Sequence, residues 1–122
     1  MEAAAVVRSF LERMEARDWV GATALMAPDA SISYSATGER FTGSSFMAMN
    51  EAYPEGWRLE PVDVVAAGER VAVQVRVPNG DQVDWLSGFY TVVDGRIVEG
   101  HEHWVTERSE PAPEWRAPYT VT

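Results

Sequence analysis

The chain has 122 residues, a formal net charge of −9 at pH 7 and no cysteine. Its length and its 46% of apolar residues suit one domain, which we place at residues 1–106, followed by a C-terminal tail at residues 107–122. The absence of cysteine excludes disulfides and thiolate chemistry, and the acidic charge argues against nucleic acid as a partner. We find no apolar run long enough to cross a membrane and no signal peptide, so we expect a cytoplasmic protein without a membrane partner.

The residues before Pro28 have the pattern of two helices. Apolar side chains recur at spacings of three and four, at Val6, Val7, Phe10, Leu11 and Met14. This period predicts a helix over residues 2–16 with one apolar face. Asp18 is placed to cap a second, short helix, which Pro28 should end because proline cannot continue the helical hydrogen bonds. The two helices are expected to form a hairpin.

After the hairpin the apolar period changes to that of a strand and then returns to that of a helix. Ile32 and Tyr34 alternate with serines, which predicts a short strand. Ser44 or Ser45 can cap a third helix, which Pro54 should end.

The second half of the domain has the pattern of a sheet. Runs rich in Val, Trp and Tyr occupy residues 57–66, 69–77, 83–93 and 96–106. Asp94-Gly95 is the strongest hairpin signal between them, because both central positions of a type I′ turn need positive φ. Four such strands predict an antiparallel meander that curls around the helices and leaves a tapered cavity. A dimeric α+β barrel of the ferredoxin-like kind would explain the meander but not the helical hairpin.

The tail is rich in proline and carries Trp115 and Tyr119. Because proline restricts φ and lacks a backbone donor, we predict an extended tail rather than a helical one. Leaving both aromatic side chains in water would forgo roughly 1.5–3 kcal/mol of apolar burial for each. We therefore expect the tail to pack on the domain or on a dimer partner.

Four local motifs follow one another along residues 3–106. They are Asp29-Ala30 after the helical hairpin, Thr42-Gly43 before the third helix, GFYTVVDGRIV at residues 88–98, and Glu102-His103-Trp104. In this order they resemble the SnoaL-like and limonene-epoxide-hydrolase-like families of the NTF2-like superfamily, including its polyketide-cyclase-like branch. The resemblance implies an α+β, NTF2-like cone, with a two-helix N-terminal hairpin and a third helix packed on a curved, mostly antiparallel sheet. It also implies an apolar pocket and, in many members, a homodimer formed through the outer face of the sheet.

The resemblance also bears on the last strand. In the epoxide hydrolases an Asp two residues before an aromatic residue activates water, and Glu102 stands at the matching place before Trp104. Those enzymes use an Arg-x-Asp pattern on an earlier strand, whereas Arg76 has no acidic residue two positions after it. This departure argues against epoxide hydrolysis itself.

Glu102 is the candidate general base. Alternation along the strand puts Glu102 and Trp104 on one face and His101 and His103 on the other. A carboxylate in an apolar pocket has its charged form disfavoured, so its pKa rises toward the range useful for proton transfer. The alternative is a structural pair between Glu102 and Arg76.

The same strand carries a possible pair of metal ligands. His101 and His103 have the spacing that lets two imidazoles bind one metal, and Glu99 or Asp84 could add an oxygen ligand. A metal site normally needs a third strong ligand, and the two histidines face away from the expected pocket. We therefore predict no metal and place the histidines at the surface or at a dimer interface, an assignment that a β-bulge would reverse.

The other candidates lie on neighbouring strands. Tyr34 and Tyr90 are expected to line the cone, where a phenol can donate a hydrogen bond to a substrate oxygen; each can also be a core aromatic residue. Gln74 and Arg76 alternate with valines and are expected to face the polar end of the pocket, unless this is an ordinary strand with both in solvent. Four valines would then form an outer apolar face with two aromatic residues and bind a second subunit: Val71, Val73, Val75, Val77, Trp85 and Phe89.

Two hypotheses follow. One is a cofactor-free acid–base enzyme, an isomerase, cyclase, dehydratase or hydrolase, that acts on a small apolar or amphipathic molecule. Its catalytic residues would be Glu102, Tyr34, Tyr90 and Arg76, and its ligand contacts Ile32, Met47, Gln74, Leu86 and Trp104. The other is a non-catalytic ligand-binding or dimeric interaction module of the same fold. No cofactor is expected, because phosphate loops, dinucleotide fingerprints and nucleophile elbows are absent.

Overall fold

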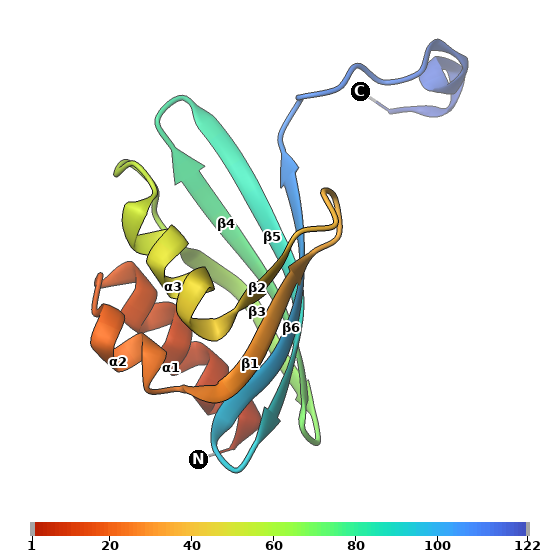
Figure 1. The fold of residues 1–122 in the computed structure, drawn as a ribbon. Coiled ribbons are helices and arrows are strands. Elements are labelled where there is room, and N and C mark those ends of the chain that lie inside the picture. The colour runs from red at the N-terminus through yellow and green to blue at the C-terminus, as the bar shows by residue number, and fades with distance from the viewer. Residues whose placement is uncertain (1, 122) are drawn as a thin grey trace.

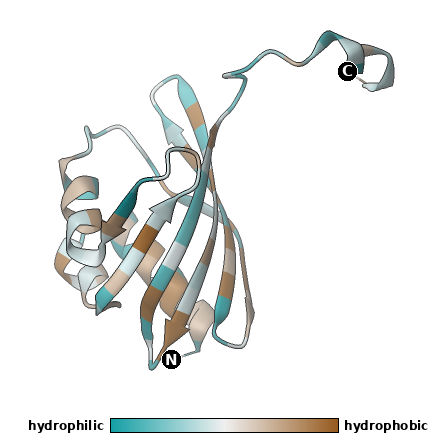
Figure 2. Cartoon of the chain, turned by 45° about the vertical axis from the view of Figure 1, so that its right-hand side comes forward, coloured by the Kyte–Doolittle hydropathy of each residue, from teal (hydrophilic) through white to brown (hydrophobic). Residues whose placement is uncertain are grey.

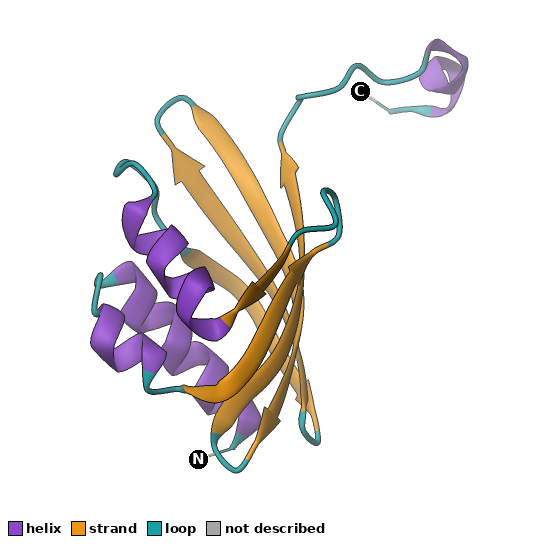
Figure 3. Ribbon diagram, in the orientation of Figure 1, coloured by secondary structure: helices purple, strands orange, loops and turns teal. Residues whose placement is uncertain are grey.

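A six-stranded sheet curls around three α-helices in the computed structural model, which describes residues 2–121 (Figure 1). The helices are α1 (Ala3–Glu15), α2 (Trp19–Thr23) and α3 (Gly43–Ala52). The strands are β1 (Met26–Tyr34), β2 (Arg40–Thr42), β3 (Glu60–Ala67), β4 (Arg70–Asn79), β5 (Gln82–Val93) and β6 (Arg96–Thr106). The helices cover the concave side of the sheet (Figure 3), which confirms the expected α+β cone with its hairpin and third helix.

The strand order is β2-β1-β6-β5-β4-β3. Neighbouring strands are antiparallel except β1 and β6, which run parallel. The predicted meander is therefore present as β3 to β6, and β1 with β2 extends the sheet beyond β6. Asp94 and Gly95 have φ values of 51° and 77°, as expected for the turn between β5 and β6. None of the helices in residues 2–121 has the length and apolar character needed to cross a membrane.

The helical hairpin differs from the prediction at its second helix. Asp18 caps α2 as expected, since its Oδ1 accepts a hydrogen bond of 2.9 Å from the Gly21 backbone N–H. The helix ends at Thr23, however, and β1 begins at Met26, two residues before Pro28. The strand tolerates this proline because the pairing of β1 with β6 is interrupted between Met26 and Ser31.

The third helix begins two or three residues earlier than predicted. Thr42 caps it, accepting a hydrogen bond of 3.2 Å from the Ser45 backbone N–H, so neither Ser44 nor Ser45 is the cap. The first meander strand starts at Glu60 rather than at residue 57. Pairing with β4 begins only there, and Trp57 contributes a single isolated bridge.

The two faces of β4 point in directions opposite to those predicted from the sequence. Its four valines, Val71, Val73, Val75 and Val77, point toward the helices and are at most 5% exposed. Gln74 is exposed and Arg76 lies half-exposed on the outer face, where its Nη1 donates to Glu60 Oε1 at 2.9 Å. Hydropathy alternates in this way along the strands (Figure 2). The apolar face of α1 is buried against the sheet. The valine face of β4 therefore packs toward the helices, because burial of apolar surface is favourable on both sides.

The tail leaves the domain where β6 ends (Figure 1). It contains a 3₁₀ helix at Glu114–Tyr119, so the prediction of a wholly extended tail is wrong for this segment. Trp115 and Tyr119 are 70% and 82% exposed, which shows that they do not pack on their own domain. Packing on a partner subunit stays a prediction.

Candidate active site

A pocket of about 660 Å³ lies between the helices and the concave face of the sheet. This volume is in the range of small-molecule sites. The helix side of its wall is mainly apolar and comes from α1, α3 and the segment after α3: Phe10, Leu11, Met14, Phe46, Met49, Asn50, Tyr53, Trp57 and Leu59. The sheet side carries most of the polar groups, and it comes from β1 and the loop after it, from Val77 of β4, and from β5 and β6.

None of the helix-side residues was predicted as a ligand contact. The apolar stripe of α1 was visible in the sequence, but it indicated a core rather than a cavity. Trp57 is held in the wall by Arg17, whose guanidinium lies 3.4 Å from the centre of the indole ring and donates to the Trp57 carbonyl oxygen at 2.6 Å. The sequence contains no local signal for this contact, because the two residues lie far apart along the chain.

The inward face of β5 and β6 is built from opposed pairs of residues. From the end of the pocket next to the tail, here called the outer end, they are Asp84–Thr106, Leu86–Trp104, Gly88–Glu102 and Tyr90–Gly100. Polar and apolar positions therefore alternate down the wall. Leu86 and Trp104, both predicted from the sequence as ligand contacts, line the pocket.

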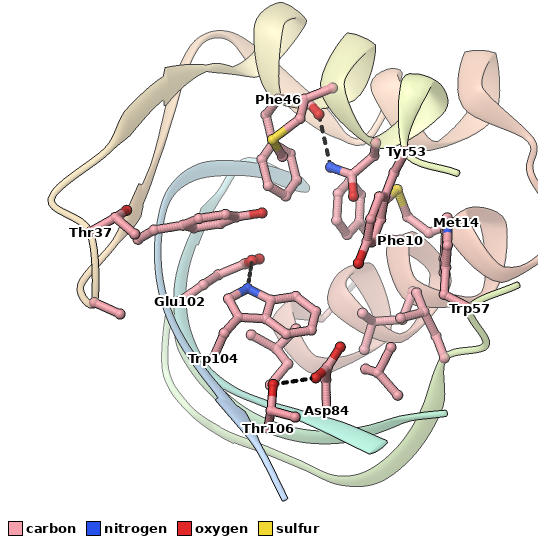
Figure 4. A pocket seen from close by; sticks show the side chains of 18 of the residues that line it. Phe10, Met14, Thr37, Phe46, Tyr53, Trp57, Asp84, Glu102, Trp104 and Thr106 are labelled. Carbon is pink, nitrogen blue, oxygen red and sulfur yellow. Dashed lines mark hydrogen bonds between the residues drawn. The ribbon is translucent and has the colours of Figure 1, made fainter. Parts of the chain in front are cut away.

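Glu102 lies in this wall and is 2% exposed. Its Oε2 accepts a hydrogen bond of 2.6 Å from the Tyr90 hydroxyl. Its Oε1 accepts one of 3.0 Å from Trp104 Nε1, which Figure 4 shows. Burial raises the pKa of the Glu102 carboxyl, and the two hydrogen bonds partly oppose this rise. The carboxyl group is thus held in one orientation while its charged form is disfavoured.

Two glycines give Tyr90 room to reach Glu102. A Cβ atom on Gly100 would lie 2.7 Å from Ile32 Cδ1 and 2.8 Å from Tyr90 Cδ1. A Cβ atom on Gly88 would lie 3.2 Å from the Tyr90 hydroxyl oxygen. The Tyr90 ring therefore lies across the backbone of Gly100, in space that a larger residue would occupy.

Tyr34 reaches the pocket from β1, where it pairs with Glu102 across the parallel strands. Burial, and secondarily the charge of Glu102, raise the pKa of the Tyr34 phenol above its usual value, which keeps the phenol neutral. Its hydroxyl makes no hydrogen bond to any residue within 2–121. A neutral donor with an unused hydrogen therefore stands close to the Glu102 carboxyl.

The pH dependence of stability offers a check on the environment of Glu102. Its pKa is raised in the folded state, so the stability it contributes is fully present below the unfolded pKa, about 4.3, and is lost as pH rises through the folded value. Each pKa unit of difference corresponds to about 1.4 kcal/mol. We expect Glu102→Gln to gain in free energy of unfolding relative to wild type as pH rises from about 4 through the raised pKa of Glu102, measured by urea denaturation. A pH-independent difference would contradict the buried environment.

Asp84 is the second carboxyl group of the pocket. From the sequence it was predicted only as a possible metal ligand. It is 9% exposed, and its Oδ1 accepts hydrogen bonds from Thr106 Oγ1 at 2.6 Å and from Gln82 Nε2 at 2.8 Å. Alternation from Tyr90 through Leu86 to Asp84 was the signal that could have placed it in the pocket.

Four residues proposed from the sequence lie elsewhere. Gln74 and Arg76 are on the outer face, so they do not contact the pocket, and Arg76 pairs with Glu60 rather than with Glu102. Ile32 and Met47 are 1% and 5% exposed but belong to the core beneath the pocket rather than to its lining. Ile32 packs over Gly100, one step further from the outer end than Tyr34.

The two histidines lie on the outer face of the sheet, away from Glu102. His101 Nδ1 lies 2.7 Å from Ser33 Oγ, and its Nε2 lies 2.6 Å from Glu99 Oε1. The His103 ring packs edge-on to Phe89, with 6.4 Å between ring centres. Asp84 is on the opposite face, and residues 2–121 contain no group of three side chains that could hold a metal ion.

The fold agrees with comparisons to known proteins. A profile of the SnoaL-like domain matches residues 7–100, and the chain therefore belongs to the SnoaL-like domain family. No curated protein matches the chain.

Solved structures of the NTF2-like kind are similar to it. A protein from Kribbella flavida, provisionally assigned as a ketosteroid isomerase, is 29% identical with a TM-score of 0.89, and the match covers 98% of this chain and 88% of that one. An LEH-like epoxide hydrolase from M. tuberculosis is 19% identical, with a TM-score of 0.72 over 84% of this chain and 82% of that one. A protein from Sinorhizobium meliloti, provisionally assigned as a polyketide cyclase, is 20% identical, with a TM-score of 0.69 over 80% and 92%.

Proposed function

We propose that the protein is a cofactor-free acid–base enzyme that moves a proton on a small, mostly apolar carbonyl compound. The observation that carries this proposal is that a buried carboxyl group, Glu102, and the free hydroxyl of Tyr34, its register neighbour on β1, line the same apolar pocket. A base and a neutral hydrogen-bond donor at one site are the two groups that enolisation of a ketone needs.

The step needs no oxidant or reductant, because a lone pair of the Glu102 carboxylate forms the new O–H bond. The Glu102 carboxylate takes a proton from the carbon next to the carbonyl, and the C–H bonding pair becomes the new C=C bond of an enolate. The Tyr34 hydroxyl donates a hydrogen bond to the enolate oxygen as negative charge develops there. The protonated Glu102 then returns the proton, either to the same carbon or to the far carbon of a conjugated system, which gives isomerisation.

Tyr90 and Trp104 are positioning residues in this proposal. Their hydrogen bonds occupy one lone pair on each carboxylate oxygen and leave the others for the substrate proton. Arg76 has no part in it, because it lies on the outer face.

The likeness to the Kribbella flavida protein supports an isomerase within this class. Cyclisation, dehydration and hydrolysis can use the same base, but epoxide hydrolysis is disfavoured by the missing Arg-x-Asp pattern. The alternative is a binding protein that holds the same ligand without proton transfer.

The test is proton exchange catalysed by the purified protein. A steroid β,γ-unsaturated ketone is incubated with it in D₂O, and conjugation is followed by ultraviolet absorbance and deuterium uptake by mass spectrometry. We expect both to proceed faster than in buffer. Saturable binding without either signal would support the binding-protein alternative instead.

We also propose a homodimer, formed through a smaller apolar surface than the one predicted from the sequence. The β4 valines are buried, so the predicted outer patch shrinks to exposed apolar residues on β5 and β6, mainly Phe89 at 46% and Val105 at 62% exposure, beside Trp85. Such patches mark interfaces in many proteins. The exposed tail is proposed to pack on the partner subunit.

Sedimentation should therefore give a dimer at micromolar concentration. We expect Phe89→Glu to shift it toward the 13.5 kDa monomer, because a carboxylate would be buried without a partner, and deletion of residues 111–122 to weaken it. Val20→Glu is the matched control, since Val20 is 85% exposed on the helical side. A wild-type protein that sediments only as a monomer would contradict the proposal.

A further inference from the structure

The outer end of the pocket holds a carboxyl group whose second oxygen is unused. Both hydrogen bonds to Asp84, from Gln82 and from Thr106, go to Oδ1. Within residues 2–121 Oδ2 has no hydrogen-bond partner and no cation. Asp84 is 9% exposed and lines the pocket, so Oδ2 is an acceptor for whatever fills this space. Figure 4 shows the Asp84 and Tyr53 side chains at the rim of the same cavity.

The charge of the lining restricts the ligand. Asp84 and Glu102 both face the pocket, and among the described residues 2–121 its lining contains no Lys, Arg or His. An anionic ligand would meet two carboxyl groups without a compensating cation. A buried ammonium group would lose several kcal/mol of hydration, whereas a hydroxyl group supplies the missing donor at a much smaller desolvation cost.

The spacing of Asp84 and Glu102 along the backbone of the sheet sets the length of the ligand. Asp84 pairs across the sheet with Thr106, and Thr106 is four residues from Glu102 on the same strand. Four residues of extended chain span about 13–14 Å. The Trp104 indole lies between the two sites in Figure 4 and provides an apolar surface along the way.

We propose that the substrate is an elongated, neutral hydroxy-ketone whose hydroxyl group donates to Asp84 Oδ2 while its ketone lies between Glu102 and Tyr34. The placement of the ketone depends on the proposed function. The placement of the hydroxyl group is inferred from Asp84 alone. Gln82 and Thr106 serve to orient the Asp84 carboxylate.

The test compares three steroid probes that share a ketone and differ at the opposite end. Testosterone carries a hydroxyl there, androstenedione carries a second ketone, and the corresponding deoxy-steroid carries no oxygen. Binding is measured by quenching of tryptophan fluorescence and by calorimetry. We expect wild type to bind testosterone about tenfold more tightly than the other two, since a hydrogen bond to a charged group contributes roughly that factor.

Asp84→Asn should change the order of the probes rather than only weaken binding. Gln82 and Thr106 both donate, so the amide oxygen of the new residue stays with them and its NH₂ group faces the cavity. Androstenedione, which can only accept, should then bind at least as tightly as testosterone. Thr106→Val, which removes one orienting donor, should reduce the preference for testosterone without reversing it.

Asp63→Asn is the control for charge, because Asp63 is exposed on β3, outside the pocket. The proposal is overturned if wild type binds the three probes equally or binds none of them, or if Asp84→Asn keeps the wild-type order. Its failure is separable from that of the proposed function. A hydroxyl preference without proton exchange would remove the catalytic role of Glu102 and leave the Asp84 site standing, and exchange without the preference would do the opposite.

Discussion

Replacing Glu102 with glutamine is expected to lower turnover by roughly 10²–10⁴-fold and to leave ligand affinity within a few-fold. A glutamine amide has nearly the same shape as the carboxyl group, but it cannot take up the substrate proton. Its oxygen can accept from Trp104, and its NH₂ group can donate to the Tyr90 hydroxyl, so both contacts keep a partner. The lost turnover would thus reflect chemistry rather than a collapsed pocket.

Steady-state isomerisation and tryptophan fluorescence measure the two effects separately. Glu60→Gln is the matched control, since Glu60 pairs with Arg76 on the outer face. In wild type, turnover should rise with pH through the raised pKa of Glu102, because the base acts as carboxylate. Unchanged turnover in Glu102→Gln would remove Glu102 from the mechanism.

Replacing Gly100 with alanine is expected to destabilise the protein by about 1–3 kcal/mol and to lower turnover. The new methyl group would overlap both Ile32 and the Tyr90 ring, at 2.7 and 2.8 Å. The backbone of Gly100 lies in the central part of the sheet and cannot move away easily, so the ring must shift. A displaced Tyr90 would lose its hydrogen bond to Glu102, and the carboxyl group would lose its fixed orientation.

Gly43→Ala provides the comparison, because a Cβ atom there meets Ala30 and Met26 only at ordinary contact distances of 3.5 Å. Position 43 also opens α3, where alanine is favoured over glycine. Urea denaturation should show a loss for Gly100→Ala and no loss for Gly43→Ala. Equal stability of the two variants would mean that the Tyr90 ring is not confined as described.

Helices, strands and turns could be predicted from the sequence where the local pattern was strong. The spacing of the apolar residues of α1 matches one face of a helix, and the Asp94-Gly95 turn imposes its own backbone geometry. Alternation along β6 also predicted that Glu102 and the histidines lie on opposite faces, because the period of a strand is a local property. The C-terminal end of α2 and the cap of α3 were misplaced, since pairing with distant strands decided where those elements begin and end.

The choice between the faces of β4 needed the tertiary structure. Local alternation separates Arg76 from the valines but does not say which set meets the helices, and the predicted direction was wrong. The position of Asp84 as a hydrogen-bond acceptor in the pocket also needed the tertiary structure. It depends on Thr106 and Gln82 both donating to one Asp84 oxygen.

The sequence by itself therefore determined the periods, the turn and the family-like order of motifs, which are properties of neighbouring residues. Only the packing of the sheet on the helices decided which side chains share the pocket. Tyr34, Tyr90 and Glu102 come from three strands, and Gly100 admits the Tyr90 ring. Contacts of this kind depend on distances between segments far apart in the chain, and no local pattern encodes such distances.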